Sequence, residues 1–422
     1  MEKTQEDVSK LETLNVGMVG HIDHGKTTLL WKLSGKWTDT HSEELKRGIT
    51  IKLGYADVII RKSSEKDFGM IRNAKSESIS DIKKGKEGYN IKEGQATKYV
   101  TFVDAPGHEM LMATMLSGAA MIDAAILVIA ANEGIKPQTR EHLLALEAKK
   151  IKNIIIVQNK IDLISREKAL ENYKKIKEFV KGTIAENSEI IPCSAQQEIN
   201  IDKILEALVR IKIPERDTES EPVFIIARSF DINKPGTKIK DLKGGILGGT
   251  LKKGKLKVGD EIEIKPGISL KKENQLVYET VKTKITGIFR GSYRIETAGP
   301  GGSLALETEL DSILTKADNL SGCIAGLSGK LPEITSNIKI KFNLFKEVYG
   351  ADKNIPIEQI KLSELLMLSV STSITVGMVK KIKNNECELS LRIPIVPFIG
   401  ENTGIARNIS GHWRLIGYGE IL

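Results

Sequence analysis

A chain of 422 residues exceeds what one hydrophobic core usually serves, so its length predicts two or three domains. Its longest apolar run, residues 124–131, is too short to cross a bilayer, and the polar start MEKTQEDVSK lacks a signal-peptide core, so we expect a cytoplasmic protein with no membrane span. The formal net charge of +8 is compatible with a polyanionic partner but does not identify one.

Between Leu14 and about Ile211, short apolar runs alternate with amphipathic patterns. This alternation predicts an α/β domain with a doubly wound, mostly parallel sheet. The expected strands are residues 15–19, 53–60, 99–104, 124–131, 153–158 and 189–193, and the expected helices are residues 108–119, 138–149, 167–186 and 201–211.

The first strand leads into GHIDHGKT, residues 20–27, which fits the GxxxxGK[ST] phosphate-binding loop and is followed by the helical run TLLWKL. In such a loop the backbone N–H groups and the helix N-terminus cradle phosphates, the lysine neutralises their oxygens, and the threonine hydroxyl ligates Mg²⁺. The imidazoles of the histidines at 21, 24, 41 and 412 are assigned no role. We predict that nucleotide is bound by Ile22, Asp23, His24, Gly25, Lys26, Thr27 and Thr28.

Two segments fit the moving parts of a nucleotide switch. In RGIT, Thr50 is the natural second hydroxyl ligand for Mg²⁺ when a triphosphate is present, although a β-branched residue could simply begin the next strand. In DAPGH, Asp104 can hold Mg²⁺ through water, and the Gly107 amide can meet the γ-phosphate. His108 follows directly and is the candidate that positions the attacking water, the alternative being a solvated loop histidine.

Residues 62–98 are rich in Lys, Ser, Glu and Gly and have little apolar periodicity. They are typical of a loop inserted between two strands. The insertion contains neither Cys nor His, so we expect no zinc site in it. The cysteines Cys193, Cys323 and Cys387 are far apart and form no CxxC pair, which predicts reduced thiols and no local zinc site.

Nucleotide identity is predicted by NKID, residues 159–162, placed directly after an apolar strand. The Asp162 carboxylate can accept hydrogen bonds from the N1–H and the exocyclic amine of guanine, a pair of donors that adenine lacks. SAQ follows a later strand, and one of its backbone amides can close over the guanine O6. Either motif, NKID or SAQ, could by itself be an ordinary loop. The predicted guanine-binding residues are Asn159, Lys160, Asp162, Ser194, Ala195 and Gln196.

The polar connector IPERDTESEP, residues 213–222, ends the α/β region. Short β-rich runs follow, including residues 223–228, 261–264 and 284–290, separated by turns such as GGILGGT and LKVGD. They predict one closed β-barrel, and a further series of strands from about Leu331 predicts another. The expected domains are therefore a GTP-binding domain over residues 1–215 and barrels over residues 216–330 and 331–422.

Taken together, GHIDHGKT, RGIT, DAPGH, NKID and SAQ resemble the translational GTPases related to elongation factor Tu. A narrower resemblance, to the gamma subunit of archaeal and eukaryotic translation initiation factor two, runs from about Leu14 to Leu422. It is carried by HSEELKRGITIKLGYAD, DAPGHEMLMATMLSGAAMIDAAILVIAANE, RSFDINKPGT, GGILGGTLKKGKLKVGDEIEIKPG, LTKADNLSGCIAGLSGKLP and WRLIGYGEI.

This resemblance implies a P-loop GTPase domain followed by two barrels, with GTP, GDP and Mg²⁺ as ligands. It also implies GTP-dependent binding of methionylated initiator tRNA, alpha and beta partner subunits in a heterotrimer, and delivery to the small ribosomal subunit, with no membrane partner. By the family pattern one Mg²⁺ falls on Thr27 and Thr50, and a possible second metal site falls on Asp23 and the Gly48 backbone. Many members carry a four-cysteine zinc knuckle in the insertion, and this sequence lacks it.

Three other interpretations stay open. An elongation-type carrier, such as the factor for selenocysteyl-tRNA, would share every GTPase motif but resembles a longer chain with further C-terminal domains. The GTPase subunit of a sulfate-activating adenylyltransferase also joins a phosphate loop to barrels and would copurify with a nucleotidyltransferase rather than tRNA. A scaffold that binds nucleotide without hydrolysis would release no phosphate in the presence of small ribosomal subunits.

Overall fold

The computed structural model of the chain describes residues 10–37, 54–63, 88–92, 94–104, 121–233, 236–238, 242–272, 275–348 and 355–422. These residues form two compact units. The first holds the described residues up to Asp104 together with 123–139 and 151–214. The second holds residues 121–122, 140–150 and the described residues from 215 onward. The predicted helix over residues 108–119 lies outside the described part.

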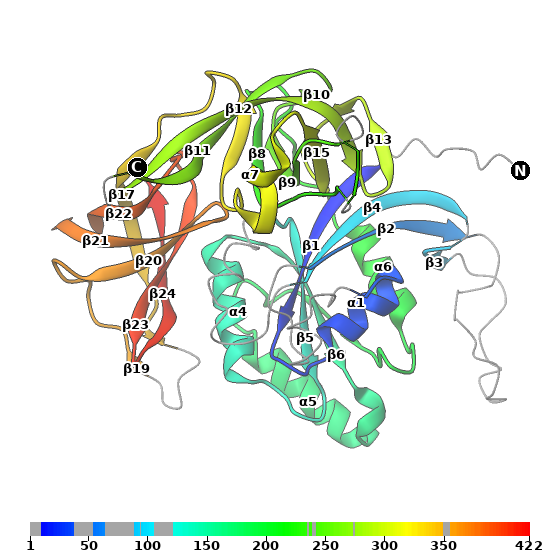
Figure 1. Cartoon of the computed structure of the whole chain (residues 1–422). Helices are drawn as coiled ribbons and strands as arrows, with labels where there is room; N and C mark the ends of the chain where they lie inside the picture. The colour runs from blue at the N-terminus through cyan, green and yellow to red at the C-terminus, as the bar shows by residue number, and fades with distance from the viewer. Residues whose placement is uncertain are drawn as a thin grey trace, which may run out of the picture. The chain divides into compact units, whose positions relative to one another are not determined.

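The first unit is built on a seven-stranded sheet with the order β3-β2-β4-β1-β5-β6-β7. Strands β1 to β6 are labelled in Figure 1. The five strands from β4 to β7 in this order run parallel, whereas β2 is antiparallel to β4 and β3 is antiparallel to β2. The predicted doubly wound, mostly parallel sheet is therefore confirmed. The bounds are β1 (Glu12–Gly20), β2 (Gly54–Ser63), β3 (Gly88–Asn90), β4 (Gln95–Asp104), β5 (Ala124–Ala130), β6 (Asn153–Asn159) and β7 (Glu189–Pro192).

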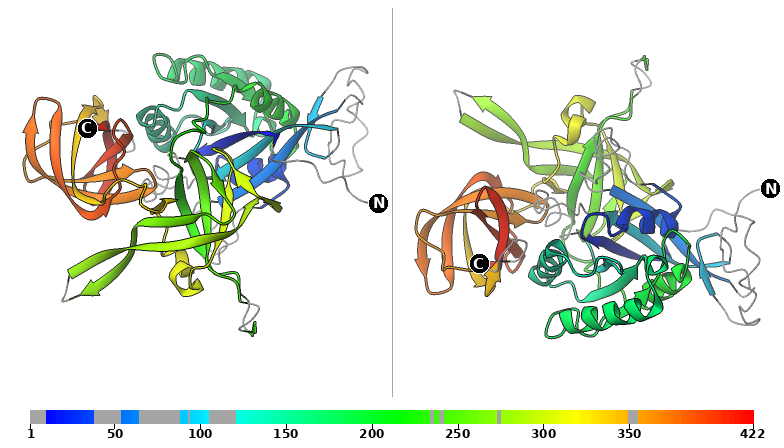
Figure 2. Two further views of the ribbon diagram at one scale, coloured as in Figure 1. Left: turned by 90° about the horizontal axis from the view of Figure 1, so that it is seen from above. Right: turned by 90° about the horizontal axis from the view of Figure 1, so that it is seen from below.

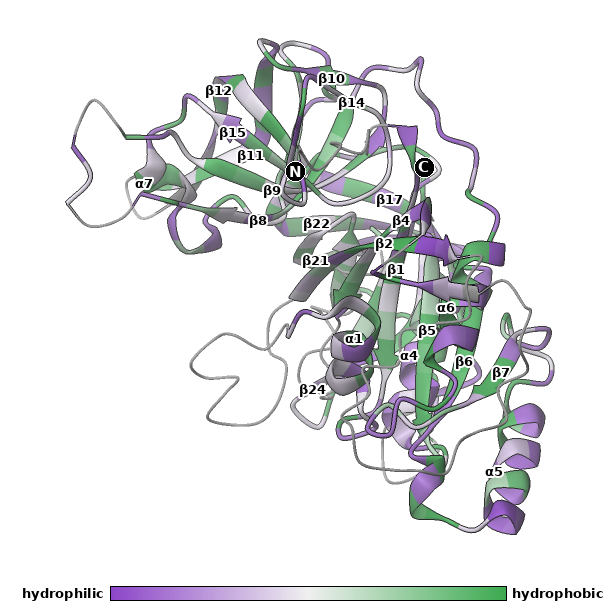
Figure 3. Ribbon diagram, turned by 90° about the vertical axis from the view of Figure 1, so that its right-hand side faces the viewer, coloured by the Kyte–Doolittle hydropathy of each residue, from purple (hydrophilic) through white to green (hydrophobic). Residues whose placement is uncertain are grey.

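The central strands of this sheet are apolar along nearly their whole length because both faces of a parallel sheet are covered. All seven residues of β5 are buried, and Figure 3 shows the same hydrophobic colour along β5 and β6. The core of the unit gathers Leu14, Val16 and Met18 of β1 with Ile126 and Val128 of β5. The motifs of the sequence therefore follow strands that are anchored in a buried core.

The insertion predicted over residues 62–98 is narrower than expected at its edges. Strand β2 extends to Ser63 and β4 already begins at Gln95, because the two strands pair as an antiparallel ladder up to Lys62 and Gln95. The hydroxyl of Thr97 also donates to the Ile60 carbonyl at 2.7 Å. Residues 64–87 lie outside the described part of the chain.

Within the described residues, the helices that alternate with these strands along the chain are α1, α4, α5 and α6, and α1 and α6 pack against one another (Figure 1). The helix predicted over residues 167–186 ends earlier, at Phe179. There Gly182 takes the left-handed conformation, with φ 74°, and the Thr183 hydroxyl binds the Val180 carbonyl at 2.7 Å, which favours a turn. The bounds are α1 (Lys26–Ser34), α4 (Pro137–Ala148), α5 (Arg166–Phe179) and α6 (Ile201–Arg210); residues of α4 from 140 onward belong to the second unit.

The side chain of Lys98 on β4 caps the C-terminus of helix α6. Its side chain is buried, and its ammonium donates to the carbonyls of Leu208, Val209 and Ile211 at 3.4, 2.9 and 2.6 Å. The last carbonyls of a helix have no partner within the helix, so a buried lysine can satisfy them. Burial lowers the pKa of Lys98, and the nearby Glu12 carboxylate opposes that effect.

Replacing this lysine should destabilise the first unit. We expect Lys98→Met to lower the free energy of unfolding by about 1–3 kcal/mol, because buried carbonyls would lose their donor while relief of a buried charge offsets part of the loss. Urea denaturation followed by circular dichroism measures this. Lys152→Met, at an exposed lysine of the same unit, is the matched control and should change stability little. Equal stability of the two variants would contradict the capping role.

The second unit begins with a closed barrel of six strands, β11-β16-β8-β9-β15-β12, which closes through the β11–β12 pair and carries β13 at its edge. The two longest strands were underestimated from sequence: a register shift between Ile264 and Ile268 interrupts the β11–β12 ladder without ending it. The bounds are β8 (Val223–Phe230), β9 (Ile246–Lys253), β10 (Leu256–Lys257), β11 (Glu261–Lys272), β12 (Gln275–Arg290), β13 (Tyr293–Ile295), β14 (Thr297–Ala298), β15 (Leu304–Thr308), β16 (Ile324–Leu327), α7 (Ser312–Thr315) and η5 (Lys316–Asp318).

A further closed barrel follows, with the order β17-β22-β21-β20-β23-β24, and its ring is visible in orange to red in Figure 2. Both predicted barrels are thus present. Closure removes the free sheet edges, and the alternate inward side chains form a core that includes Ile340, Leu368 and Leu389. The bounds are β17 (Thr335–Leu344), β18 (Glu347–Val348), β19 (Ile355–Pro356), β20 (Leu365–Val370), β21 (Ser373–Lys383), β22 (Glu386–Ile395), β23 (Asn402–Ile409) and β24 (His412–Ile421).

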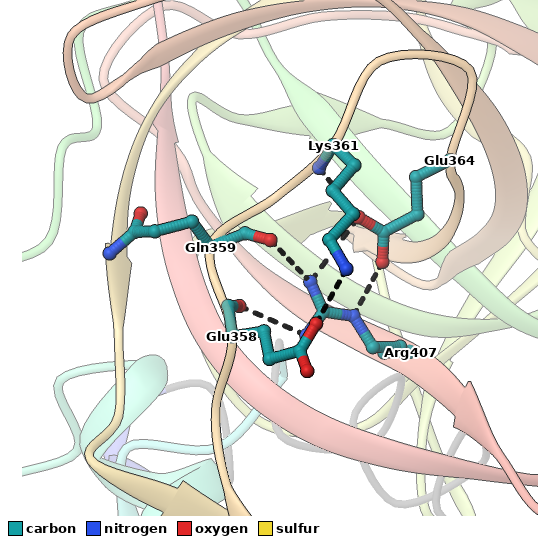
Figure 4. A network of polar contacts seen from close by, with 5 residues as sticks. All are labelled: Glu358, Gln359, Lys361, Glu364 and Arg407. Carbon is teal, nitrogen blue, oxygen red and sulfur yellow. Dashed lines mark hydrogen bonds and ion pairs between the residues drawn. The ribbon is translucent and has the colours of Figure 1, made fainter.

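An arginine fastens the segment before β20 to this barrel (Figure 4). Arg407 of β23 pairs with the Glu364 carboxylate through two of its nitrogens and donates to the carbonyls of Glu358 and Gln359 at 3.0 and 3.3 Å. Lys361 adds an ion pair with Glu358 at 2.6 Å. The fixed fork of the guanidinium suits such a many-partner contact, so we interpret this network as structural.

All three cysteines are buried free thiols. Burial raises the pKa of Cys193 to about 12, that of Cys323 to about 11 and that of Cys387 to about 12. Thiols of this kind carry almost no thiolate near neutral pH and are unreactive. Within the described residues, no helix is long and apolar enough to cross a membrane.

Candidate nucleotide-binding site

The predicted motifs follow strands that end at one edge of the first sheet. The register pairs Met18 with Asp104, Gly20 with Val128, and Ala130 with Asn159. Because β1, β4, β5, β6 and β7 are parallel, their C-terminal ends lie at the same edge of the sheet. That edge is where open α/β sheets bind their ligands.

Two glycines allow the phosphate loop to approach its neighbours closely. Gly20 has φ 136°, and a Cβ there would come within 2.3 Å of the Val128 carbonyl oxygen. Gly25, at φ 87°, directly precedes α1, and a Cβ there would lie 2.5 Å from the amide nitrogen of Asn159. Any other residue would clash with the end of β5 or with the guanine motif.

Lys26 and Thr27, the first residues of α1, bind to other predicted parts of the site. The Lys26 ammonium donates to the His21 carbonyl at 2.8 Å, and so lies across the loop. The Thr27 hydroxyl donates to a carboxylate oxygen of Asp104, which is fully buried, at 3.1 Å. Of the other predicted loop residues, Asp23 is exposed and Ile22 and Thr28 are half-buried.

This hydroxyl and carboxylate fit a magnesium ion by their chemistry. Mg²⁺ prefers oxygen ligands and usually takes only one or two from protein side chains, with phosphates and waters supplying the others. Thr27 and Asp104 place two such oxygens beside the phosphate loop. Thr50, Gly48, Gly107 and His108 lie outside the described residues, so their predicted places stay predictions.

Asn159, the last residue of β6, joins three of the motifs. Its side chain is buried, and its amide nitrogen donates to the His24 carbonyl at 3.0 Å. Its amide oxygen accepts a hydrogen bond from the Ala195 backbone at 3.0 Å. The phosphate loop, NKID and SAQ are therefore connected through one side chain.

The remaining NKID residues lie at the surface of the site. Lys160 adopts the left-handed conformation, with φ 61°, and pairs with Glu133 at 3.6 Å. The 3₁₀ turn η3 (Ile161–Leu163) then presents Asp162 with an exposed side chain. An exposed carboxylate at this edge can receive the two donors of a guanine base.

The SAQ loop is held from two sides. Ser194 and Ile199 exchange backbone hydrogen bonds at 3.3 and 3.0 Å, which closes the loop on itself. Glu198 pairs with Lys32 of α1 at 2.7 Å. Ser194 and Ala195 are buried and Gln196 is exposed, so the loop offers its backbone and one exposed polar side chain to the site.

Two features of the site were not predicted from sequence: the Lys32–Glu198 ion pair and the environment of the His24 ring. The ring is fully buried, and its Nδ1 lies 3.2 Å from the Val128 carbonyl oxygen. Burial lowers the pKa of His24 to about 3. The His21 ring lies edge-on to it, with 5.0 Å between the ring centroids, and burial lowers the pKa of His21 as well. The contact joins residues 104 positions apart, so no local pattern could indicate it.

Known families match two stretches of the sequence. The sequence profile described as "Elongation factor Tu GTP binding domain" matches residues 11–214, and the one described as "Initiation factor eIF2 gamma, C terminal" matches residues 336–421. The chain is 51% identical over 417 residues to "Translation initiation factor 2 subunit gamma" of Methanococcus maripaludis, covering 98% of this chain and 99% of that protein. It is 49% identical to the protein of that name from Pyrococcus furiosus, covering 97% of each chain.

Solved structures resemble the chain in fold. A bacterial selenocysteine-specific elongation factor superposes with a TM-score of 0.74 at 22% identity, covering 97% of this chain and 58% of that longer one. The elongation factor SelB of Methanococcus maripaludis, solved with a GTP analogue, gives a TM-score of 0.70 at 22% identity and covers 79% of that chain.

Proposed function

Because the chain belongs to the gamma-subunit family of translation initiation factor 2 and is a translational GTPase, we propose that it carries methionylated initiator tRNA. It binds the tRNA in its GTP form, delivers it to the small ribosomal subunit, and hydrolyses GTP to GDP on release. The observation that carries this proposal is identity near one half over almost the full length, barrels included. The likeness to elongation factors, at 22% identity, concerns the fold alone.

In this proposal the phosphate loop from Ile22 to Thr28 binds the nucleotide phosphates. Its backbone amides and the N-terminus of α1 face them, and Lys26 neutralises their oxygens. The Asp162 carboxylate accepts hydrogen bonds from guanine. The Asn159 side chain binds both the phosphate loop and the SAQ loop and so holds them together. Lys160 and the Ser194–Gln196 segment flank the base.

Magnesium would be held by Thr27 and Thr50, with Asp104 acting through water, and a second ion by Asp23 and the Gly48 backbone. The ion supplies positive charge beside the phosphate oxygens when GTP is bound. Gly107 meets the γ-phosphate through its amide, and His108 positions the attacking water. The conformation of the segment from Asp104 to Gly107 then depends on whether GTP or GDP is bound.

The proposal includes alpha and beta partner subunits, a cytoplasmic location and three domains with boundaries near residues 215 and 330. The surplus of basic residues adds phosphate contacts to the tRNA, so affinity should fall as salt rises. That contribution is blind to which tRNA is bound. Discrimination must therefore come from recognition of the methionyl group and of initiator-specific features.

The test is filter binding with the factor reconstituted from its three subunits. Methionylated initiator tRNA, its deacylated form and methionylated elongator tRNA are compared, each with a non-hydrolysable GTP analogue and with GDP. We expect tight binding only of the first tRNA with the analogue, because the triphosphate orders the switch segments. If GDP serves as well, or deacylated tRNA binds equally, the initiator-carrier function is wrong.

The two magnesium threonines should differ in nucleotide dependence. Thr27→Ala should weaken Mg²⁺-dependent binding of GTP and GDP alike, by about tenfold or more, whereas Thr50→Ala should weaken mainly GTP. Nucleotide affinity measured by fluorescence with Mg²⁺ and with EDTA separates these effects. Thr183→Ala, at a threonine outside every predicted motif, is the control. Equal loss of both nucleotides in the Thr50 variant would remove Thr50 from the switch.

A further inference from the structure

We propose that the His24 imidazole is a positioning residue for guanine nucleotide: it fastens the phosphate loop to β5 and thereby places the carbonyl that Asn159 binds. This rests on the nucleotide site proposed above. The side chain has no assigned role in the sequence motif, where position 24 is one of the four variable residues between the two glycines. Its geometry gives it one.

The environment of the ring determines its hydrogen. The imidazole is fully buried, and a carbonyl oxygen can only accept, so the Nδ1 atom 3.2 Å from Val128 must carry the proton of the neutral ring. The Nε2 atom is then an acceptor, and it has no hydrogen-bond partner within the described part of the chain. An apolar side chain would avoid that buried unpaired atom. What histidine adds here is therefore the directional bond from Nδ1.

The bond lies where it controls the curvature of the loop. Val128 is the register partner of Gly20, and its carbonyl oxygen is the atom that a Cβ on Gly20 would meet. The same oxygen accepts the hydrogen bond from His24 Nδ1. One fixed atom of β5 thus contacts the loop at its first glycine and again at His24, so the turn between them is pinned to the sheet.

The backbone of the same residue connects to the guanine half of the site. The His24 carbonyl accepts from Asn159, whose amide oxygen binds the Ala195 backbone. Contacts therefore run from β5 through His24 and Asn159 to the SAQ loop. If the ring loses its bond to Val128, the His24 carbonyl is free to turn, and both the phosphate loop and the base-binding loops lose a shared reference point.

Three substitutions at position 24 separate the bond from the shape of the ring. Asparagine carries its amide nitrogen on Cγ, as imidazole carries Nδ1, and so keeps a donor for Val128. Glutamine places its amide one bond farther out, nearer to Nε2, and leucine has similar bulk with no donor. Ile156→Ala, at a fully buried residue in the centre of β6, is the control for lost stability.

The experiment measures dissociation of fluorescent N-methylanthraniloyl GDP and of a GTP analogue from the full chain by stopped flow, with thermal melts of each variant. We expect His24→Leu and His24→Gln to release nucleotide about tenfold faster or more, the effect of one buried hydrogen bond. His24→Asn should recover most of that loss. Ile156→Ala should lower the melting temperature without faster release.

A double-mutant cycle tests the connection to Asn159. Asn159→Ala alone should also speed release, and adding His24→Leu should raise the rate by less than the product of the two single effects, because both act through one carbonyl. Equal release from the Asn and Leu variants, or effects that multiply fully, would overturn the inference. Should the Leu variant fail to fold, the Asn and Gln pair decides. A wild-type chain without saturable guanine-nucleotide binding would instead refute the nucleotide site itself.

Discussion

Replacing Asp162 with asparagine should turn the preference of this chain from guanine to xanthine nucleotides. A carboxylate at this position accepts from the N1–H and the exocyclic amine of guanine. The amide of asparagine presents a donor instead, which suits the carbonyl that xanthine carries at the same ring position. Two hydrogen bonds to a charged group contribute roughly 1.5–3 kcal/mol each, so GTP affinity should fall by about 10²–10⁴-fold.

The position of Asp162 allows nucleotide selectivity to be changed without disturbing the fold. Its side chain is exposed on the turn η3, after the buried Asn159 that holds the neighbouring loops, so the substitution should leave the fold intact. A competition assay of GTP against XTP measures the selectivity. Asp202→Asn, in the first turn of α6 and outside every motif, should behave as the parent chain. Unchanged selectivity for GTP would remove Asp162 from the guanine site.

His108→Ala should slow GTP hydrolysis stimulated by small ribosomal subunits by about 10²–10⁴-fold, the range for loss of a group that assists proton transfer or holds the reacting water. Nucleotide affinity should stay nearly unchanged, since the imidazole is proposed to face water rather than the nucleotide. His108 follows Gly107 directly, and the same motif begins with Asp104, whose carboxylate contacts Thr27.

Single-turnover phosphate release with the reconstituted factor measures this effect, and nucleotide binding is measured on the same preparation. His412→Ala, at an exposed histidine of β24, is the matched control. A loss of rate accompanied by an equal loss of GTP affinity would indicate a binding role for His108. A parental rate would mean that His108 is an ordinary solvated histidine.

Sequence alone was sufficient wherever the signal is local. The strands of the first unit other than β3 could be predicted because apolar runs of strand length alternate with helical patterns, and the phosphate loop and NKID could be located because they follow such runs directly. Strand β3 lies within the segment that was predicted to be a loop insertion. The GTPase class and both barrels were inferred in the same way and are confirmed. The end of α5 at Phe179 was also within reach, since Gly182 is a residue that commonly follows a helix.

Tertiary structure decided what depends on contacts between distant residues. The Val128 carbonyl binds His24, Lys98 binds carbonyls at the end of α6, and Asn159 binds the His24 carbonyl, each across more than a hundred positions. Asn159 also binds the Ala195 backbone in the next loop, 36 positions away. Sequence periodicity shows that a residue is buried, but it does not show which buried group it meets. A hydrogen bond depends on the positions of two atoms to within a few tenths of an ångström, and only the packing of the whole sheet sets those positions.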